Sequence, residues 1–388
     1  MSQAFTTTPA DRRVAAIAAQ CVMCGLCLPH CPSYLVTRNE AESPRGRLAL
    51  MARIATGQAT GDSQPSLDSC LACGRCERVC PPKVPFIEAL ILTRSGRART
   101  REHWAGQLAR RLARRPALLQ MLLRGAVAVR AFSPSAFRRR TNLDGLASTI
   151  SARAARHTRA NGTKARTDLI LAGCAAHTLE RSSVEAISFV AAIAGAKPVI
   201  DDARCCGALD QHLGFASPPC MPIVDEPDRI VAINSGCTAA WQRRLATPAI
   251  TGVASWLEQQ WPQLVDRFAT RPMRIALHVP CTQQGLAGEA ESMRRLIDQL
   301  PGAIRLELPV QPGCCGAAGT YCMNQPAISQ QLGATVAEQI RMLHPDIVVS
   351  ANGGCRAQLS QALFDLGTPM LVLHPAELVA DYLNGRPE

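Results

Sequence analysis

The sequence is poor in aromatic residues, and none of its apolar runs is long enough to cross a bilayer. Phe, Trp and Tyr make up only 4% of its 388 residues. Residues Met1 to Gln20 contain no apolar segment of the signal-peptide type, so we expect a cytoplasmic protein in a reducing compartment. A glycine-rich dinucleotide-binding turn, a Ser/His/Asp constellation and a paired acidic motif are also missing. The sequence therefore offers no dinucleotide site and no obvious hydrolytic machinery.

Cysteine, in contrast, is abundant, and eight of the 18 cysteines form two ladders with the same spacing, C-x2-C-x2-C-x3-C-P. The first ladder consists of Cys21, Cys24, Cys27 and Cys31, and the second of Cys70, Cys73, Cys76 and Cys80. This is the bacterial ferredoxin signature, in which three thiolates hold one [4Fe-4S] cluster and the fourth reaches the other cluster. The signature predicts one cluster held by Cys21, Cys24, Cys27 and Cys80, and another held by Cys70, Cys73, Cys76 and Cys31.

Zinc binding and disulfide formation are both disfavoured for the ladders. A zinc site typically takes two separated C-x2-C pairs and needs neither a third cysteine at the same step nor a closing Cys-Pro. A disulfide framework suits short exported chains that cannot build a core, and this chain is long.

Helical signals surround the ladders. Ser43 to Arg53 has the pattern of a helix with Ser43 as its N-cap and Pro44 in its first turn. Asp11 to Gln20 and Phe86 to Leu92 are further helical stretches. We therefore expect residues 1–93 to form a mainly helical ferredoxin-like module with two [4Fe-4S] clusters.

Positive charge is concentrated in the segment that follows, residues 94–166. It holds 18 Lys and Arg but only Glu102 and Asp144, a local excess of 18 − 2 = +16 in a chain with a net charge of +12. We expect a basic helical linker, whose apolar stretch Pro116 to Phe132 could contact an anionic membrane or an acidic partner subunit. A solvated connector is the alternative. Nucleic acid is disfavoured, because no suitably interleaved aromatic residues and no DNA-binding motif accompany the charge.

From Asp168 onward, short β-branched runs alternate with helical stretches, which is typical of βαβ units and a parallel sheet. The pattern occurs twice, and an internal repeat of this length predicts two similar lobes, residues 167–266 and 267–388. The matching segments are Asp168 to Cys174 with Arg274 to Cys281, Cys205-Cys206-Gly207 with Cys314-Cys315-Gly316, and Ala232 to Cys237 with Val349 to Cys355. The whole chain is thus expected to be α+β, with a mainly helical ferredoxin module followed by two tandem α/β lobes with parallel sheets.

Each lobe carries four cysteines at positions where open α/β sheets bind ligands, just beyond the carboxyl ends of expected strands or on a loop between them. The sets are Cys174, Cys205, Cys206 and Cys237 in the first lobe, and Cys281, Cys314, Cys315 and Cys355 in the second. A lone cysteine is more often a small buried hydrophobe. Two matched sets instead predict convergence of the thiols on a further iron-sulfur cluster or on zinc.

Several other residues near the lobe cysteines have weaker signals. Cys220 and Cys322 could supply a fifth ligand, although unliganded packing is the simpler interpretation. His177, His212 and His278 could ligate iron or move protons, but backbone-satisfied histidines are commoner. Arg204 and Arg356 could bind a carboxylate or tune a cluster. Pro218, Pro219 and Pro222 stand where a crossover helix is expected, so the first lobe is expected to be abbreviated and could bind nothing.

These features resemble the proteins with cysteine-rich CCG domains, and most of all the family of glycolate oxidase iron-sulfur subunits. The resemblance covers nearly the whole chain, and it rests on Ser43-Pro44-Arg45-Gly46-Arg47, Cys206 to Leu213 and Cys314 to Tyr321. It implies an electron-transfer subunit with no catalytic residue of its own. Its partners would be an FAD-containing subunit that oxidises glycolate or a similar 2-hydroxy acid and a respiratory acceptor such as quinone. The complex would be cytoplasmic or peripheral at the inner face of the cytoplasmic membrane.

One departure limits the resemblance. Heterodisulfide reductases close each lobe with C-x2-C, whereas Cys237 and Cys355 have no cysteine three residues later. Electron transfer is therefore the main interpretation, and catalytic thiol-disulfide reduction is an alternative to it. Electron transfer for lactate or glycerol 3-phosphate oxidation also stays open, as does a non-catalytic scaffold whose lobes hold zinc or free thiols and dock flavoprotein subunits.

Overall fold

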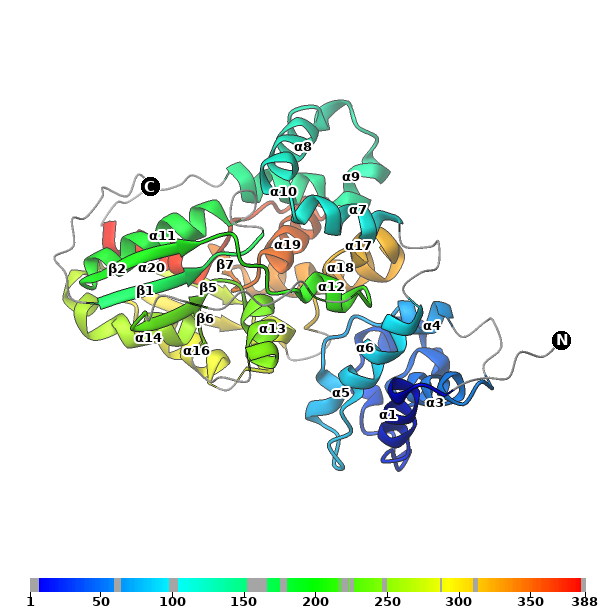
Figure 1. Cartoon of the computed structure of the whole chain (residues 1–388). Helices are drawn as coiled ribbons and strands as arrows, with labels where there is room; N and C mark the ends of the chain where they lie inside the picture. The colour runs from blue at the N-terminus through cyan, green and yellow to red at the C-terminus, as the bar shows by residue number, and fades with distance from the viewer. Residues whose placement is uncertain are drawn as a thin grey trace.

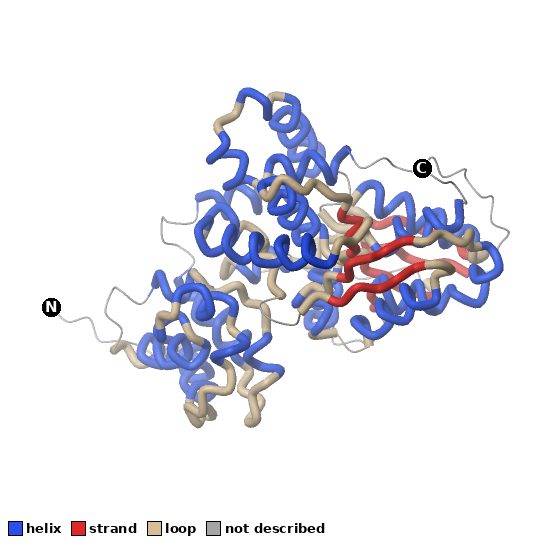
Figure 2. The backbone as a smooth tube through the Cα atoms, turned by 180° about the vertical axis from the view of Figure 1, so that it is seen from behind, coloured by secondary structure: helices blue, strands red, loops and turns tan. Residues whose placement is uncertain are grey.

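The computed structural model places a helical N-terminal part beside a larger α/β part (Figure 1). The structure describes residues 7–58, 64–97, 104–151, 166–174, 180–215, 217, 223, 227–245, 250–286, 288–309 and 313–384. Seen from behind, all strands lie in one half of the molecule and the N-terminal helices in the other (Figure 2). This arrangement confirms the predicted fold class.

The N-terminal part is built from short helices around a small apolar core. Its helices are α1 (Pro9–Ala18), α2 (Pro32–Thr37), α3 (Pro44–Ala55), α4 (Gln64–Asp68), α5 (Arg75–Arg78) and α6 (Phe86–Arg97), with 3-10 turns at Leu28–His30 and Glu40–Glu42. Ser43 caps α3 as expected, because its Oγ accepts a hydrogen bond of 3.0 Å from the Gly46 amide. Val14, Met51 and Leu90, from α1, α3 and α6, meet in the core.

The described part of the basic segment is helical and contacts the second lobe. Its helices are α7 (Trp104–Ala113), α8 (Pro116–Ala128), α9 (Ser135–Thr141) and α10 (Leu143–Ser151), with a 3-10 turn at Arg130–Phe132. Asn142 donates to Gln358 Oε1 over 2.5 Å, and the Asp144 amide donates to Gln361 Oε1 over 2.9 Å. The segment is therefore attached to helix α19 (Gly353–Asp365) rather than free. Among the described residues, no helix combines the length and apolarity needed to span a membrane.

The α/β part contains two four-stranded parallel sheets with the same strand order. The first sheet runs β2-β1-β3-β4 and the second β6-β5-β7-β8. The strands are β1 (Arg166–Leu171), β2 (Ala196–Asp201), β3 (Arg229–Ala232), β4 (Ile250–Gly252), β5 (Met273–Leu277), β6 (Ala303–Glu307), β7 (Ile347–Val349) and β8 (Val372–Leu373). The equal order confirms the two tandem lobes predicted from the repeat.

The two sheets face each other across one shared layer of helices. This layer is formed by α11 (Arg181–Ile193), α14 (Val253–Leu264), α16 (Glu289–Gln299) and α20 (Pro375–Asn384). The outer faces are covered by α13 (Ser235–Leu245) on the first sheet and by α18 (Pro326–Leu343) and α19 on the second. The remaining short elements are α12 (Ala208–His212), α15 (Cys281–Gln284), a 3-10 turn at Val265–Arg267 and α17 (Tyr321–Asn324).

The lobes differ in the crossover before their third strands. The second lobe uses the 18-residue helix α18, whereas the described residues of the first lobe form only the five-residue α12. The prediction of an abbreviated crossover rests on three prolines that lie outside the described residues, Pro218, Pro219 and Pro222.

Candidate metal centres

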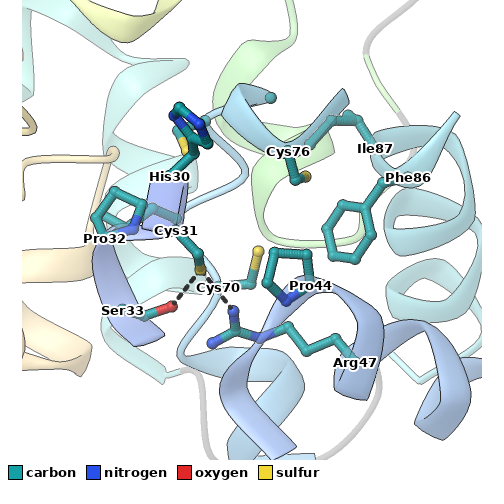
Figure 3. Close-up of a pocket in the computed structure, with 13 residues that line it drawn as sticks. His30, Cys31, Pro32, Ser33, Pro44, Arg47, Cys70, Cys76, Phe86 and Ile87 are labelled. Carbon is teal, nitrogen blue, oxygen red and sulfur yellow. Dashed lines mark hydrogen bonds between the residues drawn. The ribbon is translucent and has the colours of Figure 1, made fainter. Parts of the chain in front are cut away.

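Four ladder cysteines line one pocket in the N-terminal part. Cys31 of the first ladder faces Cys70, Cys73 and Cys76 of the second across this pocket. Figure 3 shows Cys31, Cys70 and Cys76 pointing into this space from separate segments. We call it the second-ladder pocket. It brings together the four thiols expected to share one cluster, and their assignment as ligands is a proposal.

Donors surround the sulfur atoms of this pocket. Arg47 on α3 is 1% exposed, and its Nη1 lies 3.7 Å from Cys31 Sγ (Figure 3). Ser33 Oγ lies 3.4 Å from the same sulfur, and the Ala72 amide donates to Cys70 Sγ over 3.5 Å. Hydrogen bonds and positive charge at thiolates stabilise the reduced, more negative form of a cluster. The pocket therefore fits an anionic iron-sulfur group.

The two ladders follow the same unusual backbone path. Met23 and Ala72, each two residues after the first cysteine of its ladder, have φ values of 56° and 49°. Gly25 and Gly74, each one residue after the second cysteine, have φ values of 82° and 68°. Left-handed conformations are costly outside glycine. Their recurrence at matching positions indicates that both loops are shaped to wrap one corner of a bound group.

The first ladder brings three of its thiols together at the surface. Burial raises the pKa of Cys27, and the neighbouring thiolates of Cys21 and Cys24 raise it further. Cys24 is exposed, whereas Cys21 and Cys27 are half-buried. Cys80 borders the same apolar core as Cys21. The place of Cys80 as the fourth ligand of this set stays a prediction.

The lobe cysteines also form two groups. In the first lobe, Cys206 Sγ and Cys237 Sγ lie 3.2 Å apart, and Cys205 hydrogen-bonds with both Cys174 and Cys206. In the second lobe, Cys315 Sγ and Cys355 Sγ lie 2.8 Å apart. The hydrogen bond with Cys315 and burial raise the pKa of Cys355. The thiols of Cys281 and Cys314 lie close enough to raise this pKa further. The eight lobe thiols thus form two groups of four, one in each lobe.

His278 belongs to the group in the second lobe. It follows β5, is 2% exposed, and its Nδ1 lies 3.0 Å from Ser350 Oγ. One of its ring nitrogens and the sulfurs of Cys315 and Cys355 all lie within 4.8 Å of one another. Burial, with a smaller contribution from the Arg75 charge, lowers the pKa of His278 to about 4. A neutral imidazole beside thiols is a usable metal ligand.

The second-ladder pocket lies directly against the thiols of the second lobe. Cys73 packs with Leu71, Cys314 and Tyr321 in one small cluster. Burial and the nearby Cys281 thiolate raise the pKa of Cys73 to about 12. Tyr321 Oη donates to the Ser69 carbonyl over 2.8 Å, which fixes α17 against the ladder. Two groups of thiols, one from each part of the chain, therefore share a buried boundary.

The weaker candidates have different roles. Arg356 is 1% exposed and pairs with Glu180 at 2.8 Å and with Glu377 at 2.9 Å. Arg204 pairs with Asp201. The two arginines therefore bind carboxylates of this same chain. His212 is half-buried by its exposed area, but both of its ring nitrogens are buried, and desolvation and the Arg94 charge lower its pKa to about 3. Cys322 is half-buried, and Cys220 and His177 lie outside the described residues.

Sequence reasoning misses two residues. The motif from Ser43 to Arg47 includes Arg47, but nothing in it indicates the contact with Cys31. His374 has no assigned role in the sequence, yet it is fully buried and its Nε2 lies 2.8 Å from the Ile233 carbonyl, which joins the two lobes. The place of His374 directly after a β-strand, matching the position of His278 after β5, is the available signal.

Comparisons with known proteins agree with this anatomy. The sequence model of the 4Fe-4S dicluster domain family matches residues 17–84, and that of the Cysteine-rich domain family, CCG, matches residues 275–360. The dicluster domain implies two [4Fe-4S] clusters in the N-terminal part. The second match falls on the second lobe.

Full-length relatives agree as well. The chain is 28% identical to the glycolate oxidase iron-sulfur subunit of Escherichia coli (strain K12), over 88% of this chain and 89% of that protein. It is 24% identical to the probable glycolate oxidase iron-sulfur subunit of Bacillus subtilis (strain 168), over 93% of each. Lactate utilization protein A of Geobacillus thermodenitrificans (strain NG80-2) matches at 31% over 29% of this chain and 48% of its own length. The chain is a homologue of the glycolate oxidase iron-sulfur subunits, with a 4Fe-4S dicluster domain and a cysteine-rich CCG domain.

Proposed function

We propose that this chain is the electron-transfer subunit of a glycolate oxidase-type complex. It would take electrons from an FAD-containing subunit that oxidises glycolate or a similar 2-hydroxy acid, and pass them toward a respiratory acceptor such as quinone. The observation that carries the proposal is the second-ladder pocket, where Cys31 from one ladder meets three thiols from the other. The names of the full-length relatives support the substrate class.

Two [4Fe-4S] clusters, when bound, supply sites that accept and release single electrons. The chain's own residues set the conditions for this exchange. Arg47 and Ser33 place a charge and a hydroxyl at Cys31, which favours added negative charge there. The exposed Cys24 puts the first ladder at the surface, where a partner can approach it, while Cys73 places the second ladder against the second lobe. This order supports a path from the surface toward the lobe.

The basic segment supports a docking role. Phe132 and Phe137, at 90% and 52% exposure, stand among the arginines of α8 and α9. An apolar and cationic surface of this kind suits an anionic membrane or an acidic subunit. Co-sedimentation of the assembled complex with vesicles of anionic and of neutral lipid at low and high salt tests the membrane role. Salt-insensitive solubility without vesicle binding would contradict it.

The relay proposal is tested with Cys24→Ala and Cys73→Ala in the assembled complex. Each variant should lose electron transfer to the respiratory acceptor, because a cluster loses a ligand. Hydroxy-acid oxidation should continue when an artificial acceptor takes electrons directly from the flavin of the partner subunit. Cys322→Ala is the matched control, because Cys322 belongs to neither ladder and should keep both activities. Loss of both activities in a folded Cys24 or Cys73 variant would argue against a pure relay.

A thiol-disulfide reductase is the second candidate. It is favoured by the first lobe, where Cys206 and Cys237 lie 3.2 Å apart beside the vicinal partner Cys205. A thiolate there could attack a substrate disulfide and form a mixed disulfide, and a neighbouring thiol would then release the second substrate thiol. Two electrons from a reduced donor would restore the dithiol. Turnover of a disulfide by the purified chain with such a donor tests this activity, and its absence would leave the relay alone.

A further inference from the structure

The second lobe contains a buried imidazole close to two thiols. His278 is 2% exposed, and within the part of the chain that the structure describes, its Nε2 has no hydrogen-bond partner. One ring nitrogen of His278 and the sulfurs of Cys315 and Cys355 lie within 4.8 Å of one another. A buried nitrogen without a partner is unfavourable, so such an atom in a native site calls for a bound ion or an ordered water.

The opposite side of the ring is held in the way that metal-binding histidines are held. Ser350 Oγ lies 3.0 Å from His278 Nδ1 and can accept a hydrogen bond from it. Ser350 is fully buried. With the proton on Nδ1, Nε2 is the ring nitrogen whose lone pair is free to bind a metal. Metal-ligating histidines usually donate from their other ring nitrogen to a neighbouring oxygen, which fixes both the tautomer and the orientation.

The first lobe provides an internal comparison, because its equivalent positions are apolar. Leu171 is the equivalent of His278, because each stands three residues before the first cysteine of its lobe. Ala232 is the equivalent of Ser350, because each stands five residues before the last cysteine of its lobe's set of four. Leu171 and Ala232 are paired across β1 and β3 and pack with Cys206 in an apolar cluster. The equivalent of the Cys315 and Cys355 pair, Cys206 and Cys237, thus has a leucine beside it. The His-Ser pair is specific to the second lobe.

We propose that the second lobe holds a mixed imidazole and thiolate metal centre in which Nε2 of His278 is a ligand beside Cys315 and Cys355. Cys281 and Cys314 are the nearby thiols that can complete the donor set. Such donors suit Zn²⁺ and the iron of an iron-sulfur cluster, because both accept sulfur and nitrogen. The first lobe, without the histidine, differs from this centre in affinity or in the group that it holds.

This inference deepens the proposed function, since it assigns a centre next to the second-ladder pocket. The test begins with full-length protein purified without oxygen, in which zinc, iron and acid-labile sulfide are measured per chain. About eight irons belong to the two ladder clusters. Zinc, or iron and sulfide beyond that amount, is the expected result. Fully loaded ladders with no further metal overturn the inference but leave the relay standing, whereas empty ladders contradict the relay itself.

The ligand is then identified directly on the wild-type protein. If the centre is iron-sulfur, pulsed EPR of protein labelled with ¹⁵N-histidine should show nitrogen coupling to its paramagnetic state. If it is zinc, X-ray absorption at the zinc edge should show a nitrogen neighbour among the sulfurs. A shell of sulfur alone, or no histidine nitrogen coupling, would overturn the assignment in either case. These measurements do not depend on a variant that has to fold.

Substitutions complete the test. His278→Leu, which copies the first lobe, should lower the metal content of the second lobe while the signals of the ladder clusters persist. His278→Cys should retain metal but lose the nitrogen signal, because a thiolate replaces the imidazole. Ser350→Ala keeps Nε2 but releases the ring, and should weaken metal binding about 10- to 100-fold. Unchanged metal content in a folded His278→Leu protein would contradict the proposal.

Discussion

At the scale of single residues, Arg47 is the side chain most closely tied to one cluster site. Its Nη2 donates to Ser69 Oγ over 2.9 Å and its Nε to the Ser66 carbonyl over 2.6 Å, which fixes the guanidinium beside Cys31. The residue is 1% exposed, so its charge is weakly screened by solvent. A fixed cation of this kind favours the reduced state of whatever the thiols hold.

Arg47→Met should therefore lower the reduction potential of the second-ladder cluster. The variant loses a positive charge and a hydrogen-bond donor to sulfur, and we expect a shift on the order of 60 mV, which is a tenfold change for a one-electron couple. Redox titration followed by EPR measures it. Arg53→Met on the same helix is the control, since Arg53 is exposed and donates to the carbonyl of the exposed Gln58. An equal shift in both variants would mean that net charge, and not the contact, is responsible.

At the scale of elements, the contact between α10 and α19 depends on a glycine. A Cβ added at Gly145 would lie 2.0 Å from the Ala357 carbonyl oxygen, and the Gly145 amide donates to Gln361 Oε1 over 3.2 Å. The helices can approach this closely only because position 145 has no side chain. The basic segment is thereby held on the second lobe.

Gly145→Ala should separate these helices and destabilise the protein by about 1–3 kcal/mol, the usual cost of overpacking. Gly125→Ala is the matched control in α8, because nothing lies within 4 Å of its added Cβ. That substitution should instead stabilise the chain by about 0.5–1 kcal/mol, since alanine favours helix. Urea unfolding of both variants measures the difference. Equal and small effects would show that α10 does not pack on α19 in solution.

The sequence is informative about elements where local chemistry dictates them. The Ser43 cap and Pro44 predict α3, and the repeated strand patterns predict two similar parallel sheets. Contacts between distant segments cannot be predicted in the same way. Spacing places Cys73 in a ladder but says nothing of Cys314, 241 residues later, against which it packs. The attachment of α10 to α19 is likewise missed, because a basic composition predicts solvent exposure rather than a glycine-mediated contact.

At the scale of the whole molecule, the two lobes are joined by a buried ionic network. Glu377 on α20 accepts hydrogen bonds from Arg356 Nη1 at 2.9 Å and from Ser182 Oγ at 2.6 Å. Arg356 also donates to Glu180 at 2.8 Å, so residues of the second lobe bind side chains that precede or begin α11 of the first. Removing one member of such a network leaves a buried charge without its partner.

Glu377→Gln should therefore destabilise the folded chain at neutral pH. Burial alone would raise the pKa of Glu377, but the Arg356 charge and the hydrogen bonds outweigh it and lower the pKa to about 2. A lowered pKa contributes stability that is complete above the unfolded value near 4.5 and is lost as the pH falls through about 2. The shift corresponds to about 3 kcal/mol at pH 7.

Urea unfolding without oxygen measures this stability for the wild-type chain and for Glu377→Gln from pH 7 to pH 4. The difference between their free energies of unfolding should stay nearly constant down to about pH 5 and become smaller near the pKa of Glu377 in the unfolded chain. At that pH the unfolded wild-type chain begins to bind a proton at Glu377, whereas the folded chain keeps this carboxylate deprotonated. Glu185→Gln on α11 is the control, since its exposed pair with Arg181 should contribute less than about 1 kcal/mol. If Glu377→Gln and Glu185→Gln have the same free energy of unfolding at pH 7, the carboxylate of Glu377 does not hold the lobes together.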